Sequence, residues 1–295
     1  MRLIKKALKN PKAALLVVIS KFHFLSDKAY IKLKYFISFG KRINLKNPKT
    51  YNEKLNWLKL YDRNPKYPKM VDKFGVREYI KEKIGEEYLI PLLGVWDSFE
   101  EIDFDSLPNQ FVLKCTHDSG SVVICKDKTT FDIEKAKEKL NRKFKKNLYW
   151  WSREWVYKDL KPKIIAEKYM EDSEYKELRD YKFFCFSGEP KCLFVATERP
   201  HNTKFDFFDL EFNHLPILNG HPNSEKQIEK PKCFDKMIEL SKILSQGMKH
   251  VRVDFYEIDG RIYFGELTFF HYSGFIDFEP DEWNYKFGEW IDLSK

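Results

Sequence analysis

The sequence predicts an α+β fold in which antiparallel hairpins pack with amphipathic helices. Three observations predict it. Runs of β-branched and aromatic residues occur in pairs joined by short turns, most clearly at 250–270 on either side of Asp259-Gly260. Segments with the apolar spacing of helices separate these pairs. A basic stretch with helical character precedes them all.

The composition supports a folded chain with a sizeable core. Its 295 residues are 43% hydrophobic and 17% aromatic, which suits one multi-lobed unit or two domains and excludes a disordered chain. The 53 basic and 45 acidic residues give a net charge of +8. Residues 1–49 contribute 13 basic side chains and one acid, Asp27, so they carry +12, and residues 50–295 carry 40 against 44, or −4. The basicity therefore belongs to the N-terminal segment.

We expect residues 1 to about 45 to be helical, with Pro11 and Gly40 as interruptions. Lysines alternate there with an apolar run at 13–19. Two interpretations stay open: the segment 1–49 contacts an anionic membrane surface or an acidic glycan, or it is an ordinary amphipathic pair with its lysines in solvent. The run is shorter than the roughly 20 residues that span a bilayer, and no signal-peptide cleavage pattern follows it.

Five cysteines, an odd number without a Cys-x-x-Cys pair, indicate reduced thiols and not a disulfide or zinc framework. We therefore expect a cytoplasmic protein, peripheral at the inner membrane face if the basic segment binds lipid. Nucleic acid is not an expected partner, because the basic residues are confined to the N-terminus.

The segment 50–108 predicts two helices and a strand. Thr50 and Glu53 have the spacing of a capping box for a helix that ends near residue 61. Two prolines make 62–68 a turn or linker, and a second helix is expected over 70–83, carrying Lys73. A strand at 89–96 and a loop at 97–108 with a helical turn follow.

The middle of the chain predicts further strands. Residues 111–115, with Lys114, pair with 122–125 across the small polar loop 116–121. Such a loop either lets backbone N–H groups approach a phosphate or is an ordinary hairpin connection. The remaining elements are expected as follows: a helix at 131–147, an aromatic stretch at 149–157 that is either core or a stacking platform, a strand at 164–170, a hairpin from 180–188 and 191–197, irregular loop at 199–232, and a helix at 234–248.

The register of the 250–270 hairpin decides whether its charges meet. A two-residue loop turns Glu266 away from Asp254, whereas a three-residue loop, 258–260 with Gly260 left-handed, brings four polar residues onto one face. We predict the three-residue loop, with Arg252, Asp254, Glu266, Thr268, Ile262 and Phe264 on that face. Two carboxylates and a hydroxyl form a hard-oxygen site for Mg²⁺, and the alternative is a solvated, salt-bridged sheet face.

The order of these features resembles the ATP-grasp superfamily, and specifically its TupA-like branch, which is found among cell-surface polysaccharide genes. The resemblance extends over about 45–280. It is carried by the order and spacing of Asn52–Trp57, Phe111–Cys115, Asp180–Phe184, Val251–Tyr256, Glu266–Thr268 and Ser273–Phe275. It departs from the superfamily in Thr268, where asparagine is usual, and in residues 1–60, which show no complete α/β domain.

The resemblance implies two α+β lobes that clamp ATP and Mg²⁺, and it assigns roles to particular residues. The nucleotide phosphates would be contacted by Lys73 and Lys114 and covered by a lid of His117, Ser119, Gly120 and Ser121. Adenine would bind at a hinge formed by Glu167 and the backbone of Lys168, Tyr169 and Met170, while Asp180 would hold the ribose and Lys182 would share its cleft. The metal would be held by Asp254, Glu266 and Thr268, Arg252 would neutralise the transferred phosphoryl group, and the acceptor would face His271 and Ser273.

The implied activity is that of an ATP-dependent carboxylate–amine ligase acting through an acyl phosphate. The expected partners are an amino acid or amine and an acidic saccharide, or its nucleotide-sugar or lipid-linked precursor. The alternatives are a phosphotransferase, a glycosyltransferase and a non-catalytic nucleotide- or glycan-binding scaffold. The expected division is a basic helical segment at 1–60, the N-terminal part of the grasp fold at 61–110, a nucleotide-clamping lobe at 111–200 and a metal and acceptor lobe at 201–295.

Overall fold

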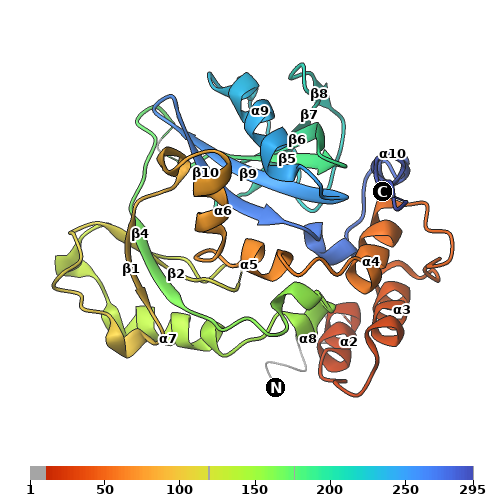
Figure 1. Cartoon of the computed structure of the whole chain (residues 1–295), viewed down its shortest axis with the longest axis horizontal. Coiled ribbons are helices and arrows are strands. Elements are labelled where there is room, and N and C mark those ends of the chain that lie inside the picture. Colours follow the sequence, from red (N-terminus) through yellow and green to blue (C-terminus); the bar gives the residue numbers. More distant parts are fainter. Residues whose placement is uncertain (1–10, 119, 176, 295) are drawn as a thin grey trace.

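Two antiparallel sheets, each with its own helices, form the two lobes of the protein (Figure 1). The computed structural model describes residues 11–118, 120–175 and 177–294. The smaller sheet has the strand order β1-β4-β2-β3 and the larger one β10-β9-β5-β6-β7-β8. Both sheets and their helices agree with the α+β fold that the sequence predicts. Within these residues no helix combines the length and hydropathy that crossing a bilayer requires.

Buried side chains alternate with more exposed ones along the strand β2 of the smaller lobe. The strands of this lobe are β1 (Leu92–Trp96), β2 (Phe111–Cys115), β3 (Val123–Cys125) and β4 (Ile164–Lys168). Phe111, Leu113 and Cys115 of β2 are fully buried against α7 (Ile133–Phe144), whereas the side chain of Lys114 points to the other face. Successive side chains of a strand point to opposite faces of the sheet, so a strand with one covered face buries every second residue. The lobe has an apolar core separate from that of the larger lobe.

The larger lobe contains β5 (Asp180–Phe186), β6 (Glu189–Thr197), β7 (Lys204–Phe208), β8 (His214–Leu215), β9 (His250–Ile258) and β10 (Arg261–Thr268). Helix α9 (Phe234–Ser245) packs on one face of the sheet, and α10 (Glu282–Trp290) packs on α4 (Tyr51–Tyr61). Every residue of β5 is buried, because helices and loops cover both of its faces. This central strand therefore presents its few charged residues to a protected space.

The N-terminal helices lie at the edge of the larger lobe (Figure 1). They are α2 (Pro11–Ile19) and α3 (Asp27–Phe39), which Gly40 ends in a left-handed conformation. The Thr50 and Glu53 capping box that begins α4 is formed as predicted. Shorter elements complete the chain: α5 (Tyr67–Val71), α6 (Val76–Lys83), α8 (Tyr149–Ser152), and the 3₁₀ turns η1 (Glu86–Tyr88), η2 (Phe99–Glu101), η3 (Lys128–Thr130), η4 (Trp155–Tyr157) and η5 (His271–Gly274).

The structure corrects four expectations. The predicted helix 70–83 is two helices, and Lys73 lies in the turn between α5 and α6. The segment 199–232 contains β7, whose aromatic residues pair with β6, and β8, which pairs with β7. Helix α10 was not expected. Strands β5 and β6 belong to the sheet of β9 and β10, whereas the sequence placed them with β2 in one lobe of residues 111–200.

The 250–270 hairpin reaches the predicted arrangement by a different route. Its turn has two residues, Asp259 at φ 50° and Gly260 at φ 73°, so the three-residue loop was wrong. A β-bulge between Phe264 and Glu266 shifts β10 by one residue relative to β9, which is the shift that the three-residue loop was expected to provide. Glu266 thereby lies opposite Asp254, and Thr268 lies opposite Arg252.

The same bulge separates the apolar residues of β10 from its polar ones. Phe264 pairs with Phe255, and Ile262 pairs with Glu257, on the face opposite Asp254. The sequence had placed Ile262 and Phe264 beside the charges. The offset turns them toward the core instead, where both are buried.

Candidate active site

Two adjoining cavities lie between the lobes and together form one cleft. The first encloses about 1070 Å³ beside β4, and the second about 540 Å³ over the polar face of β9 and β10. Seven lining residues are common to both: Ile90, Lys114, Gly120, Val122, Glu167, Arg199 and Tyr256. We call them the hinge cavity and the polar cavity.

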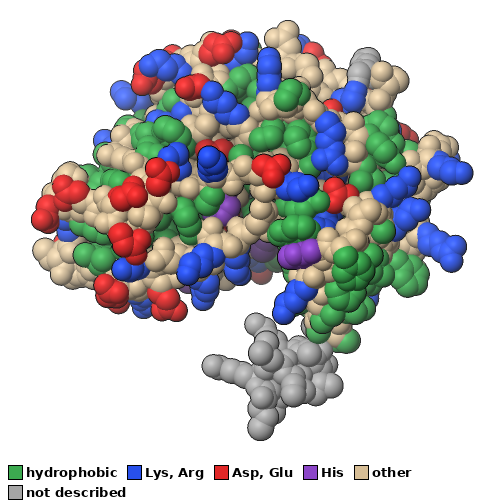
Figure 2. Space-filling model, turned by 60° about the horizontal axis from the view of Figure 1, so that its bottom comes forward, with side chains coloured by type: hydrophobic (Ala, Val, Ile, Leu, Met, Phe, Trp, Pro, Cys, Tyr) green, Lys and Arg blue, Asp and Glu red, His purple; other side chains and the backbone are tan. Residues whose placement is uncertain are grey.

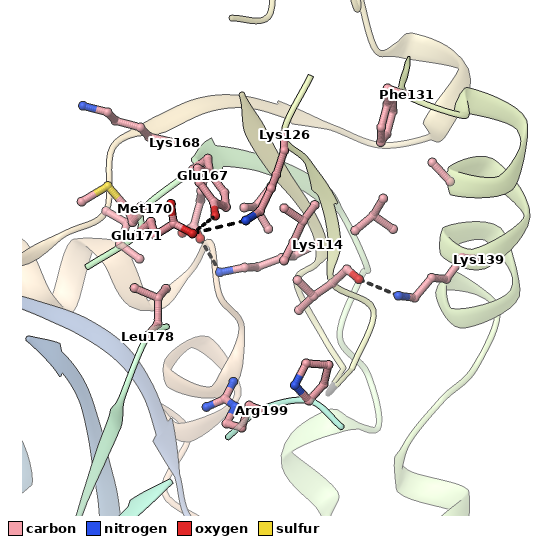
Figure 3. Close-up of a pocket in the computed structure, with 18 of the residues that line it drawn as sticks. Lys114, Lys126, Phe131, Lys139, Glu167, Lys168, Met170, Glu171, Leu178 and Arg199 are labelled. Atoms are coloured by element: carbon pink, nitrogen blue, oxygen red, sulfur yellow. Dashed lines mark hydrogen bonds and ion pairs between the residues drawn. The ribbon is translucent and has the colours of Figure 1, made fainter. Parts of the chain in front are cut away.

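The hinge cavity is centred on a buried carboxylate. Lys114 Nζ lies 2.6 Å from Glu167 Oε2 (Figure 3). Arg77 Nη1 lies 3.6 Å from Glu167 Oε1. β2 and β4 are neighbours in the sheet, so both charged groups project to the cleft side. The residues after Glu167 also line this cavity, namely Lys168, Tyr169 and Met170. The strand lysine and the hinge residues are thus brought together as the sequence predicts.

Fewer side chains of the loop 116–121 reach the cavities than the sequence predicts. Gly120, at φ 85°, lines both cavities. His117 Nε2 instead lies 3.0 Å from the carbonyl of Lys146, and its buried ring, whose pKa burial lowers, lines neither cavity. Ser121 is fixed inside the loop, where it accepts from Cys115 N at 2.9 Å and donates to Asp118. Ser119, the remaining predicted lid residue, lies outside the described residues.

Lysines enter the polar cavity from both lobes. Lys73 donates its ammonium group to the carbonyl of Asp118, across the boundary between the helices and the 116–121 loop. On β5, Lys182 Nζ lies 2.6 Å from Asp180 Oδ2 and also pairs with Asp254. Asp180 is further paired with Arg199, so its cleft position agrees with the expectation but its carboxylate is already neutralised. Asp180 Oδ1 is buried and has no hydrogen-bond partner among the described residues.

The polar face of the hairpin converges on one cationic group. Arg252 donates from Nε and Nη2 to the two oxygens of Asp254, both at 2.7 Å. The same Nη2 lies 3.2 Å from Glu266 Oε1 and 3.0 Å from Thr268 Oγ1. The three predicted metal ligands therefore point at a single positive nitrogen.

This donor set fits a divalent cation. Two carboxylates and a hydroxyl are hard oxygen ligands, and their convergence on Arg252 Nη2 shows that the fold directs them to one point. Burial would raise the pKa of Glu266, but Lys182, Lys73 and Arg252 outweigh it and hold the pKa below its usual value, so the side chain is ionised. Within the described residues no group of three His, Cys, Asp or Glu side chains is arranged for a metal, and the set depends on Thr268 as its third member.

The far end of the polar cavity is formed by η5 and α8. His271 Nδ1 accepts from Arg252 Nη1 at 2.7 Å, so its Nε2 carries the proton and donates to Asn219 Oδ1 at 2.8 Å. Burial and the adjacent Arg252 lower the pKa of His271 well below its usual value, which keeps the imidazole neutral. His271 therefore orients Arg252 and does not supply a charge.

Ser273 gives the same end of the cavity a second polar group. It lies in a left-handed turn at φ 58° and donates to Glu154 Oε1, which also accepts from Ser152 Oγ at 2.9 Å. Glu154 Oε2 has no hydrogen-bond partner among the described residues, and the side chain lines the cavity. A carboxylate held in this way can receive a donor from an incoming molecule.

Sequence reasoning missed four residues of the site: Arg77, Glu154, Arg199 and Asn219. Each comes from a helix or loop whose spatial neighbour is far along the chain, as with Glu154 and Ser273 or Asn219 and His271. No spacing in the sequence signals such pairs. Arg199 alone had a local signal, because it follows a strand end and precedes Pro200.

Comparison with protein families finds one match to most of the chain. The model of the family described as "TupA-like ATPgrasp" matches residues 53–292. A search of curated proteins finds no match.

The solved structures that match this chain include ligases and a synthase. D-alanine–D-alanine ligase from Bacillus anthracis, in complex with ATP, is 16% identical with a TM-score of 0.40 over 68% of this chain and 53% of that one. N5-carboxyaminoimidazole synthase from Aspergillus clavatus, in complex with ADP, is 16% identical with a TM-score of 0.40 over 70% and 46%. D-alanine–D-alanine ligase from Helicobacter pylori is 12% identical with a TM-score of 0.39 over 82% and 69%. The chain spans about half the length of the first of these structures.

Proposed function

The chain belongs to the TupA-like ATP-grasp family, and we propose that it is an ATP-dependent carboxylate–amine ligase that acts through an acyl phosphate. The observation that carries the proposal is the convergence of cations and carboxylates on one cleft between the lobes. Lys73, Lys114, Lys182 and Arg252 line the polar cavity together with Glu266. Asp254 pairs with two of these cations, Lys182 and Arg252. Phosphoryl transfer needs alignment and charge neutralisation more than covalent help, and this set supplies both.

In the proposed reaction a substrate carboxylate attacks the γ-phosphorus of ATP. The bond from that phosphorus to the ADP oxygen breaks, giving ADP and an acyl phosphate. An amine then attacks the acyl carbon, phosphate leaves with the bonding electron pair, and the nitrogen loses a proton to give an amide. The amine nitrogen must be unprotonated when it attacks.

The residues of the chain have separable tasks in this scheme. Lys114 and Lys73 bind phosphate oxygens, and the hinge cavity after Glu167 receives the base. Arg252, oriented by His271, neutralises charge on the transferred phosphoryl group. When Mg²⁺ is bound by Asp254, Glu266 and Thr268, it supplies further neutralisation of the same charge. Glu154, with one free carboxylate oxygen at the far end, receives the amine or a hydroxyl of the acceptor.

For the substrates we propose an amino acid or other amine and a uronic-acid-bearing surface saccharide or its precursor. The family match supports an ATP-dependent carboxylate–amine ligase in general. The polar cavity supports an acceptor with hydrogen-bonding groups, because Glu154, Ser273 and Thr268 line it.

The test is product analysis by mass spectrometry. The protein is incubated with Mg²⁺, ATP and a panel of uronosyl acceptors, each paired with amino acids or simple amines. Ligation predicts ADP, phosphate and a product whose mass is the sum of acid and amine less one water. A product that gains one phosphoryl group and no amine would instead establish a phosphotransferase, and the absence of both products with the full panel would contradict catalysis on these substrates.

A further inference from the structure

Helices α2 and α3 carry an exposed apolar surface that no other described part of the chain covers. Helix α2 is apolar along nearly its whole length, yet Ile19 is its only buried residue. Val18 is 51% exposed and Phe24, in the turn after α2, is 82% exposed. Hydrophobic side chains accordingly gather beside the start of the described chain in the space-filling view (Figure 2). We call the surface of Leu15, Val17, Val18, Phe24 and Phe36 the N-terminal apolar face.

The segment of residues 1–49, which carries this face, is strongly basic. Asp27 is the only acid among residues 1–49, and it faces the body of the protein, where Tyr149 donates to it at 2.6 Å and Arg63 and Arg153 lie 3.6 and 3.8 Å away. The exposed basic residues of the segment therefore have no acid other than Asp27 within residues 1–49. They are Lys12, Lys21, Lys28, Lys32, Lys41, Arg42, Lys46 and Lys49.

The helical pair is fixed to the acceptor end of the cleft. Tyr30 and Lys34 of α3 donate to the carbonyl of Trp151 at 2.8 and 2.7 Å. Arg153 is fully buried, lies 4.4 Å from the Tyr30 ring and donates to the carbonyl of Phe22 at 3.0 Å. Trp151 in turn lines the polar cavity near Glu154. Whatever binds the apolar face is thus held close to the acceptor end of the cleft.

We propose that the N-terminal apolar face docks on an anionic lipid bilayer. Its apolar side chains enter the boundary between head groups and acyl chains, and the surrounding lysines bind anionic head groups. The body of the protein carries −4 and is repelled by the same surface, so one orientation is favoured. In that orientation the acceptor end of the cleft lies near the bilayer, where a lipid-linked saccharide would be presented.

Charge distinguishes lipid from a second copy of the chain. Two copies that met through this face would bring two segments of +12 together, which opposes association. An anionic bilayer offers both an apolar phase and opposite charge. Docking on the bilayer does not depend on the ligase reaction, because it concerns a surface outside the cleft; only the presentation of a lipid-linked saccharide to the acceptor end rests on the proposed function.

The experiment is co-sedimentation of the full chain with large unilamellar vesicles, without nucleotide or substrate. We expect binding to vesicles of phosphatidylcholine with 30% phosphatidylserine, little binding to phosphatidylcholine alone, and release as NaCl rises from 50 to 500 mM. The triple variant Lys21→Gln, Lys28→Gln, Lys32→Gln should weaken partitioning by roughly fivefold per lysine, that is, about a hundredfold. The variant Val17→Ser, Val18→Ser, Phe24→Ser should weaken it at least tenfold.

A matched control removes exposed apolar side chains elsewhere, in Ile133→Ser, Leu218→Ser, Tyr285→Ser, and should bind vesicles like the wild type. Thermal unfolding of each variant shows that the fold is kept. Equal vesicle binding by the apolar-face variant and the control would overturn the proposal. So would a dimer in sedimentation velocity that Val17→Ser, Val18→Ser, Phe24→Ser dissociates while wild-type protein ignores vesicles, since the face would then belong to a second copy.

Discussion

His250 is a buried base that the fold keeps neutral. Its Nδ1 donates to the carbonyl of Cys185 at 2.9 Å, and its Nε2 accepts from the hydroxyl of Tyr51 at 3.0 Å. Burial, opposed by the hydrogen bond to Cys185, lowers the pKa of His250 to about 3. The unfolded chain binds a proton near pH 6.5 that the folded chain does not take up until about pH 3. The free energy of unfolding therefore falls as pH drops through this window and is unaffected by His250 above it.

We predict that His250→Phe reduces this acid sensitivity. Between pH 6.5 and 3, protonation linked to this residue alone should lower the free energy of unfolding of the wild type by up to about 5 kcal/mol, and this loss should be absent from the variant. At pH 7 the variant should be less stable by about 2 kcal/mol, because Tyr51 and Cys185 lose a buried partner. Urea unfolding at several pH values measures both effects. The exposed His201→Phe should keep the wild-type slope, and an unchanged slope in His250→Phe would contradict the assignment.

Asp254 and Glu266 should respond differently to substitution although they share a site. Asp254 is fully buried between Arg252 and Lys182, whereas the side chain of Glu266 is 40% exposed. Asp254→Ala removes the buried carboxylate that Arg252 and Lys182 share, which leaves Arg252 only Glu266 and Lys182 only Asp180, and should cost about 3–5 kcal/mol of stability. Glu266→Gln should change stability by less than about 1 kcal/mol.

Glu266→Gln is therefore the cleaner test of the proposed chemistry. We predict that it lowers ATP turnover with acceptor by roughly 10²–10³-fold, because one of two metal carboxylates is lost. Coupled ADP detection measures turnover, and urea unfolding confirms the fold. The exposed Glu239→Gln should be active, and wild-type turnover in Glu266→Gln would contradict the metal assignment.

At the scale of the element, the bulge at Gly265 places two side chains of the site. A Cβ at Gly265 would lie 3.1 Å from the carbonyl oxygen of Asp254 and 3.3 Å from the Tyr256 ring, so only glycine fits without adjustment. We predict that Gly265→Ala shifts β10 against β9 and lowers turnover at least roughly tenfold, since misplacement on the ångström scale costs that much.

The turn glycine provides the control for this prediction. Gly260 has φ 73° but open space around its Cβ position, so Gly260→Ala should cost about 1 kcal/mol of stability and keep activity. Inserting one alanine between Gly265 and Glu266 moves Glu266 opposite Val253 and should turn Glu266 and Thr268 to the other face, with loss of turnover. Full activity in the insertion variant would show that this register does not place the site.

The hairpin also shows how far the sequence predicts structure at this scale. Period two and the Asp259-Gly260 turn identify both strands, and the residues that meet, Asp254 with Glu266, were predicted. The β-bulge that brings them together was not predicted. A bulge depends on close approach of the two backbones, and its only sign in the sequence is one glycine. Lys73 was likewise expected in the cleft but on a helix, since local propensity does not reveal that the chain turns between α5 and α6.

Features that depend on distant pairing were beyond sequence reasoning. β7 is recognisable only through its pairing with β6, and α10 only through its packing on α4. The same holds for Glu154, which enters the site through Ser273, 119 positions along the chain. Residue types and order predicted the cations and carboxylates of the cleft, whereas tertiary packing selected the groups that orient them.

At the scale of the whole molecule, the lobes have separate cores and meet through polar contacts. Two of these are Arg77 with Glu167 and the backbone bond from Lys73 to Thr116 at 2.9 Å. Lobes that keep separate cores and meet through polar contacts are expected to move relative to each other. The proposed nucleotide would touch both, through Lys114 in the smaller lobe and Lys182 in the larger one, and would therefore link them.

We predict that a non-hydrolysable ATP analogue with Mg²⁺ protects both lobes from hydrogen exchange together. Protection should rise in 111–125 of the smaller sheet and in 250–268 of the larger one, and the complex should gain about 2.7 kcal/mol at a ligand concentration of 100 Kd. Lys114→Met should lose protection in both segments, because a ligand that bridges two lobes orders neither when one contact fails. Protection confined to one segment would mean that the ligand binds one lobe alone, and the cleft between the lobes would then not be the nucleotide site.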